Sequence, residues 1–362
     1  MNKNRLLIIG KFYQPIKGGI ENVTSFQQKI YKKISDIHFI FFSNLKSESK
    51  KIILFKFVSI FRQPVSIKLL FWLFKNIKKY EYIELHVPNP LIMLYLNLYN
   101  KNIKLVIHYH SDIVNQKFLN FFIRHIVYKS LTKSHKIICT SNKYSLHSKY
   151  LKNFQDKIIV IPPVIDENKF EKIKFNKNLL DENIKLLSVG RFVVYKGFEI
   201  LIKSISLLPE RFNLTLIGDG HLKNKYKFLI KKFNLMKRVK ILNEINDFEL
   251  GNEINNCNIF ILPSINKSEA FGVVLLEALY FGKPLITSNL HDSGVTEVNK
   301  DNFSGLYFNK SSHKDLALKI LEIEKKIKAG NFKFTDLRDY YEKNYSEKAI
   351  KLKYFNLYNM DI

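Results

Sequence analysis

Two glutamates separated by seven residues, Glu269 and Glu277, are the side chains of this sequence best placed for chemistry. Apolar residues at helical spacing predict a helix from about Ala270 to Phe281. The first N–H groups of a helix have no partner within it, so those of Phe271 and Gly272 could hold an anion. Glu277 would lie roughly 9 Å further along the axis. The two carboxylates could therefore contact a diphosphate ligand from two sides, with Glu277 accepting from ribose hydroxyls.

Arg191 and Lys196 are the basic residues placed to neutralise such a ligand, because a predicted strand ends just before Arg191 and a predicted helix follows Lys196. Arginine offers a planar pair of donors and lysine a point charge, so both can bind one polyanion. In a chain with 59 Lys and Arg residues, two cations prove little alone. For the segment that carries Glu269 and Glu277, the alternative interpretation is a solvated amphipathic helix with two incidental glutamates.

Histidines end two of the expected strands. His108 and His110 are two residues apart and share a face if the strand continues through both. The pair could bind a metal, but the sequence offers no third or fourth ligand nearby, and a buried or capping role is the alternative. His86 ends the preceding strand, where it could contact an acceptor. Asp112 is interpreted as the cap of the next helix.

Strand and helix patterns alternate along the chain, which predicts an α/β fold with parallel sheets. Sheets of this kind bind ligands beyond the carboxyl ends of their strands. The expected strands are Arg5–Gly10, Ile37–Phe42, Ile52–Phe57, Tyr82–His86, Lys104–His110, Lys136–Thr140, Lys157–Ile161, Ile184–Gly190, Phe212–Gly218, Arg238–Leu242, Asn258–Leu262, Leu285–Thr287 and Ser304–Phe308.

Together these motifs resemble glycosyltransferase family 4, whose members are retaining, nucleotide-sugar-dependent enzymes of the glycosyltransferase B fold. The resemblance is carried by EAFG and EALYFGKP around the glutamates, by VGRF and YKGFE around Arg191 and Lys196, by GGIE after the first strand, and by HYHSD. It implies two Rossmann-like doubly wound domains facing a cleft. Within the family, the chain is similar to bacterial O-antigen and capsule mannosyltransferase-like members.

The resemblance implies catalytic roles for Glu269, His110, Arg191 and Lys196, with His110 bonding the donor sugar. The diphosphate would be held by cations and backbone N–H groups rather than by a metal, and no Asp-x-Asp pair occurs in the sequence. We therefore expect no cofactor and no metal. The implied donor-binding residues are Gly18, Gly19, Arg191, Lys196, Ile245, Glu269, Ala270, Phe271, Gly272, Val273 and Glu277.

Three segments are expected. Residues 1–164 would form an acceptor-side Rossmann-like domain, and residues 165–345 the domain that binds the nucleotide sugar. Residues 346–362 would form a helix that crosses back to the first domain. Paired prolines in IPPV, which ends at Val164, suit a stiff connection between the domains.

The net charge of +27 is concentrated in the first half, where 27 Lys and Arg residues stand against 7 Asp and Glu up to Val164. Such a half suggests an anionic partner, either nucleic acid or an acidic membrane surface. Two basic amphipathic helices, Lys117–Lys136 and Lys68–Lys79, could rest on anionic lipid. The expected helix-turn-helix or aromatic-basic platform of a nucleic-acid-binding protein is not found, so nucleic acid is not an expected partner.

No run of apolar residues is long enough to span a membrane, and the first residues suit a strand better than a signal peptide. Cys139 and Cys257 are isolated in apolar surroundings, as expected of core residues in a reducing compartment. The expected location is therefore the cytoplasm, peripherally on the inner face of the membrane.

The expected activity is transfer of a hexose, with mannose as a candidate, from a nucleotide diphosphate sugar to a glycan acceptor. A lipid-linked acceptor in O-antigen, capsule or lipopolysaccharide synthesis fits the charge. The alternatives are a UDP-hexose donor with a soluble or glycolipid acceptor and, more remotely, a basic nucleic-acid-binding protein.

Overall fold

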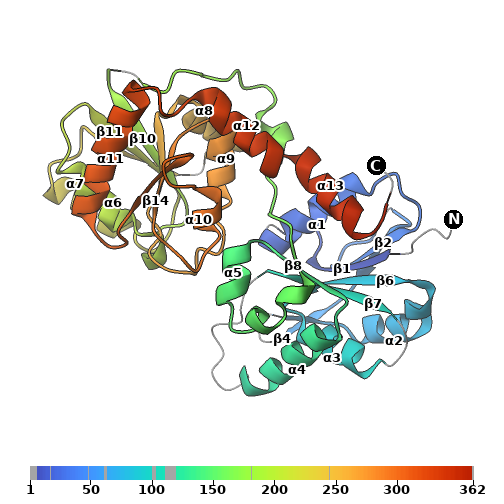
Figure 1. The fold of residues 1–362 in the computed structure, drawn as a ribbon. Coiled ribbons are helices and arrows are strands. Elements are labelled where there is room, and N and C mark those ends of the chain that lie inside the picture. Colours follow the sequence, from blue (N-terminus) through green and yellow to red (C-terminus); the bar gives the residue numbers. More distant parts are fainter. Residues whose placement is uncertain are drawn as a thin grey trace. The chain divides into compact units, whose positions relative to one another are not determined.

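The structure is a computed structural model that describes residues 6–16, 18–47, 49–60, 63–99, 103–110, 120–180, 182–243 and 245–360. The chain divides into two compact units (Figure 1). Unit 1 comprises residues 1–163 and 351–362, and unit 2 comprises residues 164–350.

Unit 1 contains one parallel sheet in the order β3-β2-β1-β6-β7-β8-β9. Its central strands are almost entirely buried, because helices cover both faces (Figure 1). Their buried side chains are mostly apolar, with Glu84, His86 and His108 as polar exceptions. The strands are β1 (Leu6–Phe12), β2 (Ile37–Phe42), β3 (Ile52–Phe55), β6 (Tyr82–Val87), β7 (Lys104–Tyr109), β8 (Lys136–Cys139) and β9 (Ile158–Val160). A separate antiparallel pair is formed by β4 (Val58–Ile60) and β5 (Gln63–Val65).

The helices of unit 1 follow the predicted apolar stripes. The expected helix at Lys117–Lys136 is described from Asn120 to Lys133, and its start, like Asp112, falls outside the described residues. The helices are α1 (Gly19–Ile30), α2 (Ile67–Asn76), η1 (Ile77–Lys79), α3 (Pro90–Leu98), α4 (Asn120–Lys133), α5 (Asn142–His147), η2 (Leu151–Asn153) and η3 (Gln155–Lys157). The end of α13 (Glu347–Leu357) also belongs to this unit.

Unit 2 contains a second parallel sheet, in the order β12-β11-β10-β13-β14-β15. Numbered within the unit, this is the order 3-2-1-4-5-6 of dinucleotide-binding domains. The strands are β10 (Ile184–Val189), β11 (Phe212–Ile217), β12 (Val239–Leu242), β13 (Ile259–Leu262), β14 (Leu285–Ser288) and β15 (Gly305–Phe308). The predicted fold class, α/β with two Rossmann-like units, is confirmed.

Two apolar cores fill unit 2, one on each face of its sheet. Leu186 and Ile261 point into one core, whereas Leu187 and Leu262 point into the other, as alternation along a strand requires. The helices are η4 (Glu167–Phe170), η5 (Val194–Lys196), α6 (Phe198–Ile205), α7 (Lys223–Lys232), α8 (Asp247–Asn256), α9 (Val274–Tyr280), α10 (Val295–Val298), α11 (His313–Lys328) and α12 (Phe334–Asn344).

Both cysteines are free and buried, as predicted for Cys139 and Cys257. None of the helices in the described residues combines the length and apolar character needed to cross a bilayer.

Candidate active site

A buried ion pair lies beyond the carboxyl ends of β10 and β13 in unit 2. The Nζ atom of Lys196 is 2.5 Å from Oε2 of Glu269, and both side chains are almost fully buried. The same carboxylate oxygen accepts from the hydroxyl of Ser264 at 2.8 Å. The structure thus brings together two of the predicted site residues, and Lys196 carries its charge in a place largely shielded from water.

Close backbone packing fixes the loop that carries Lys196. Gly197 has a φ of +70°, and a Cβ atom there would come within 2.0 Å of the carbonyl oxygen of Pro263, just after β13. A backbone hydrogen bond of 2.8 Å from Ile265 to Tyr195 joins the same two loops. Lys196 lies against Gly190 at the end of β10, where a Cβ atom would be 3.2 Å from its Cε atom. Glycine at these positions lets the loops after β10 and β13 meet.

The turn from Glu269 to Val273 departs from the prediction. The helix α9 begins at Val274 rather than near Ala270, because Gly272 adopts a left-handed φ of +76° that a helix cannot continue. The hydroxyl of Ser293 donates to the carbonyl of Glu269 and holds the turn in place. Among the described residues, no acceptor contacts the N–H groups from Ala270 to Val274. These donors are therefore free to bind an anion, although they belong to a turn.

Glu277 lies on α9, where its side chain is half-buried. Desolvation by the surrounding protein raises the pKa of Glu277 to about 7, and Lys169 partly opposes this effect. No hydrogen-bond donor contacts its carboxylate within the described part of the chain. A carboxylate that has lost water without gaining donors is poised to accept from a ligand.

Arg191 and Ile245 follow strand ends of the same sheet. Arg191 comes two residues after β10, and its side chain is exposed. Within the described residues its guanidinium has no ion-pair or hydrogen-bond partner. Ile245 follows β12 and packs against the core cluster that also contains Phe271 and Leu275. Both residues therefore border the carboxyl edge, as predicted, but their contacts with a ligand stay predictions.

Gly18 and Gly19 begin α1 in unit 1. A Cβ atom on Gly18 would lie 2.3 Å from Oε2 of Glu21, so the close approach there is to a side chain of the same helix. Gly19 has nothing within 4 Å of the corresponding position. Of the two predicted glycines, Gly19 is therefore the one with space beside it for a ligand.

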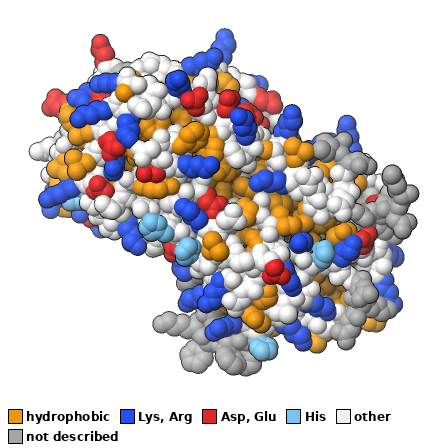
Figure 2. All heavy atoms as spheres, viewed as in Figure 1, with side chains coloured by type: hydrophobic (Ala, Val, Ile, Leu, Met, Phe, Trp, Pro, Cys, Tyr) orange, Lys and Arg blue, Asp and Glu red, His pale blue; other side chains and the backbone are white. Residues whose placement is uncertain are grey.

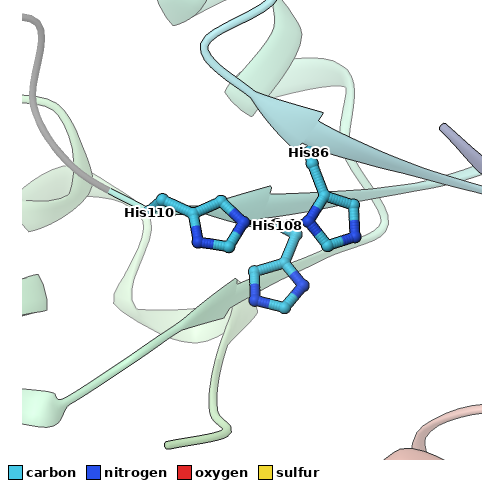
Figure 3. Close-up of side chains that lie close together, drawn as sticks. All are labelled: His86, His108 and His110. Atoms are coloured by element: carbon cyan, nitrogen blue, oxygen red, sulfur yellow. Dashed lines mark hydrogen bonds between the residues drawn. The ribbon is translucent and has the colours of Figure 1, made fainter. Parts of the chain in front are cut away.

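Three histidine rings stack at the carboxyl edge of the unit 1 sheet (Figure 3). His86 and His108 are register partners on β6 and β7, and their ring centres are 4.4 Å apart. His110 follows β7 and stacks on His108 at 4.4 Å, with the planes 3° apart. The Nε2 atom of His110 is 2.9 Å from Nδ1 of His86. Burial lowers the pKa of His108 to about 4 and holds that of His110 well below its usual range, and in both cases the neighbouring histidines add to the effect.

The sequence offered no third metal ligand near His108 and His110, and the expectation that none lies nearby is wrong. One ring nitrogen from each of His86, His108 and His110 lies within 4.8 Å of the others. However, a metal bound by histidine lies near each ring plane, and parallel rings 4.4 Å apart do not share such a point. A hydrogen bond also occupies the facing nitrogens of His86 and His110. In this conformation the histidines form a hydrogen-bonded stack, and the absence of a required metal stays a prediction.

Sequence reasoning missed the residues that hold the site residues in place. Ser264 and Ser293 bond the side chain and the backbone of Glu269, and both are fully buried. Gln27 and Glu84 stand behind His86 and His108 in unit 1. Serines after strands are too common to single out, but a glutamate inside the apolar run YIELHV was a usable signal, because a buried charge needs partners.

Comparison with known proteins gives matches along most of the chain. The family described as glycosyl transferases group 1 matches residues 169–344, and glycosyltransferase family 4 matches residues 42–169. The O-antigen chain mannosyltransferase C of Escherichia coli is 29% identical over 301 residues, which are 82% of this chain and 79% of that protein.

Solved structures match over nearly the whole length. A glycosyltransferase from Rickettsia africae gives a TM-score of 0.78 at 20% identity and covers 99% of this chain and 98% of its own. Anabaena HepE in complex with UDP gives a TM-score of 0.75 at 16% identity, with 98% and 99% covered. These identities show the fold alone. The solved structures therefore show the glycosyltransferase B fold. The two family matches together span residues 42–344 and, with the similarity to the mannosyltransferase, they show that the chain is a hexosyltransferase of the glycosyltransferase family 4 type.

Proposed function

We propose that this glycosyltransferase moves a hexose from a nucleotide diphosphate sugar to a lipid-linked glycan, with retention of anomeric configuration, in the synthesis of a bacterial surface polysaccharide. The similarity to an O-antigen chain mannosyltransferase supports this class of product and makes GDP-mannose one candidate donor. The UDP held by a structural neighbour supports a UDP-hexose as the other.

The observation that carries the donor assignment is the carboxylate of Glu277, which has no hydrogen-bond donor among the residues that the structure describes. Its desolvation costs free energy that two vicinal hydroxyls of a ribose would recover by donating to both oxygens. The turn with unpaired N–H groups precedes it on the same segment. Glu277 would thus hold the nucleoside, while the N–H groups of Phe271, Gly272 and Val273 take the diphosphate.

Catalysis would depend on charge neutralisation of the departing diphosphate by Arg191, Lys196 and the turn N–H groups. Lys196 is held by Glu269, so its ammonium is already oriented and partly desolvated before the ligand arrives. The Oε2 atom of Glu269 is occupied by Lys196 and Ser264, whereas Oε1 has no partner among the described residues. We assign Oε1 to a hydroxyl of the transferred sugar, with attack from the face that the diphosphate leaves.

An acceptor at an anionic membrane surface is supported by unit 1 and in particular by α2. Residues 49–80 contain eight Lys and Arg and no Asp or Glu. Along α2, Ile67, Phe71 and Phe74 are 68%, 66% and 71% exposed and share one helical stripe. Figure 2 shows basic side chains spread over the face in view. The cytoplasmic, peripheral location is proposed on the same grounds.

The other basic helix is less suited to lipid. The predicted apolar face of α4 is turned inward, because Ile123, Val127 and Leu131 are buried. The Nδ2 atom of Asn97 on α3 donates to the carbonyl of Ile126, which ties α4 to its neighbour. The lipid contact expected of this helix is therefore assigned to α2 instead.

The donor is tested by thermal unfolding with GDP-mannose, GDP, UDP-hexoses and UDP at equal concentrations. One nucleotide sugar is expected to raise the melting temperature through mass action, and the E277A variant is expected to lose the shift. Transfer of labelled sugar to membrane extracts then identifies the acceptor class. Stabilisation by none of these ligands, or transfer that needs a divalent ion after excess EDTA, would contradict the proposed metal-free reaction.

The membrane assignment is tested by co-sedimentation with vesicles of phosphatidylcholine, with or without phosphatidylglycerol. Binding is expected only with the anionic lipid and should fall in an F71S/F74S variant. Phe228 on the basic helix α7 is also exposed, so F228S is the matched control. Equal binding by both variants would exclude α2 as the contact.

A further inference from the structure

A buried carboxylate behind His110 organises a hydrogen-bonded network in unit 1. Glu84, on β6, is fully buried. Its Oε1 atom accepts from Nε2 of Gln27 at 2.7 Å and from Nδ1 of His108 at 2.9 Å, and its Oε2 atom accepts from the hydroxyl of Tyr358 at 2.6 Å. Burial alone would raise the pKa of Glu84, but hydrogen bonds from His108 and His86 hold it well below its usual range. The carboxylate is therefore ionised and can only accept.

An ionised Glu84 fixes the orientation of the Gln27 amide. The amide nitrogen must face the carboxylate, because an amide oxygen there would set two acceptors against each other. The oxygen of Gln27 then faces His86, with 3.0 Å between Oε1 and Nε2. Since an amide oxygen cannot donate, His86 carries a proton on Nε2.

The orientation continues from His86 to His110. When His86 carries a single proton, on Nε2, its Nδ1 has a lone pair. This atom is 2.9 Å from Nε2 of His110, so His110 must supply the proton of that hydrogen bond. Its other nitrogen, Nδ1, is then left with a lone pair. A chain of four residues, two from β6, one from α1 and one just after β7, thus determines which nitrogen of His110 can accept.

We propose that Glu84, Gln27 and His86 are positioning residues that hold His110 in the Nε2–H tautomer, so that Nδ1 accepts a hydrogen bond from a hydroxyl of the substrate sugar. The identity of the substrate as a sugar rests on the proposed function, whereas the tautomer rests on the network alone. The histidine stack in Figure 3 adds a steric constraint, since His108 lies against the face of His110 and limits ring rotation.

The tautomer is measured in the unliganded enzyme by nitrogen-15 NMR with labelled histidine, with H110Q used to assign the signals of His110. A protonated Nε2 and an unprotonated Nδ1 are expected near neutral pH. The opposite assignment would overturn the inference whether or not the enzyme transfers sugar. Conversely, the expected tautomer in a protein that accepts no nucleotide sugar would disprove the proposed function and leave the network intact.

Two substitutions of His86 separate its two hydrogen bonds. In H86N the amide oxygen can take the place of Nδ1 and still accept from His110, whereas in H86Q the amide reaches the place of Nε2 and leaves His110 without that acceptor. We expect H86N to keep the tautomer and most of the turnover. H86Q should give a mixture of tautomers and about a tenfold lower kcat/KM, as expected for one lost hydrogen bond.

The control is H147Q, because His147 on α5 is exposed and, within the described part of the chain, bonds only the carbonyl of Lys143. Thermal unfolding of each variant shows whether it is folded. If H86N and H86Q are both folded and lose the same amount of kcat/KM, His86 contributes only packing, and the positioning role is refuted. Equal retention of activity and tautomer in both would refute it as well.

Discussion

At the scale of single residues, the pairing of Lys196 with Glu269 changes what a substitution reports. Removing one partner of a buried ion pair leaves the other charge uncompensated, which typically costs about 3 to 5 kcal/mol. We expect K196M to lower turnover about 100-fold and to lower the melting temperature. The K196M/E269Q double variant should recover stability without activity. A folded K196M enzyme with near wild-type turnover would exclude Lys196 from the phosphate site.

Arg191 gives the cleaner test of the same electrostatic effect. Its side chain is exposed and unpaired among the described residues, so R191A should leave the free energy of unfolding nearly unchanged. Turnover is expected to fall about 100-fold, because under the proposed function this cation neutralises the leaving diphosphate. Arg211 is the charge-matched control, since it pairs with Glu324 by a 2.9 Å contact. If R211A impairs turnover as much as R191A, general charge rather than position is responsible.

The pH dependence should report Glu277. Its pKa of about 7 exceeds the ordinary 4.5, so the folded protein binds more protons than the unfolded chain between these values. Stability therefore falls as pH rises from 4.5 to 7, by about 3 kcal/mol in total. Donor affinity should change in the opposite direction, because under the proposed function only the ionised carboxylate can accept from both ribose hydroxyls. Isothermal titration of the donor and chemical unfolding across this pH range check both trends. In E277Q, neither the stability nor the donor affinity should change with pH in this way.

At the scale of elements, the strands were predictable and the start of α9 was not. Buried parallel strands are continuous apolar runs, so β2 and β10 could be placed to within a residue. The turn before α9 contains Phe271 at helical spacing, but spacing does not reveal the left-handed backbone of Gly272. The β4–β5 pair was missed because Pro64 argues against a strand, although proline is tolerated at a sheet edge.

The loops that carry Lys196 and Ser264 should respond to a single methyl group. Gly197 and Gly330 both have φ near +70°, but only Gly197 has backbone within 3 Å of the position of a Cβ atom. We expect G330A to cost about 1 kcal/mol from backbone strain alone. G197A should cost more than about 2 kcal/mol and weaken nucleotide binding, because the loop after β10 must move away from Pro263. Equal effects in urea unfolding would show that the contact is unimportant.

At the scale of the whole molecule, two α/β units could be predicted from the sequence. The contacts between residues far apart in the sequence could not. The register of β6 and β7 places His86 beside His108, and two histidines 22 residues apart give no sign of this contact in the sequence. The last residues of the chain also pack into the first unit. Tyr354 and Phe355 contact the ring of Tyr31, and Tyr358 bonds the buried carboxylate of Glu84.

Because the last residues pack into unit 1, we expect a substitution of Tyr358 to destabilise the first strands of the chain. Y358F removes one hydrogen bond to a buried ionised group, which is expected to cost about 1.5 to 3 kcal/mol. Hydrogen exchange should then accelerate in β1 and β6 of unit 1, while β10 and β13 of unit 2 keep their protection. The matched control is Y345F, because the hydroxyl of Tyr345 bonds the hydroxyl of Tyr340 and the carbonyl of Glu297 within unit 2. Its loss is expected to affect unit 2 rather than unit 1. If both variants accelerate exchange in both sheets alike, the two units unfold together and Tyr358 stabilises more than unit 1.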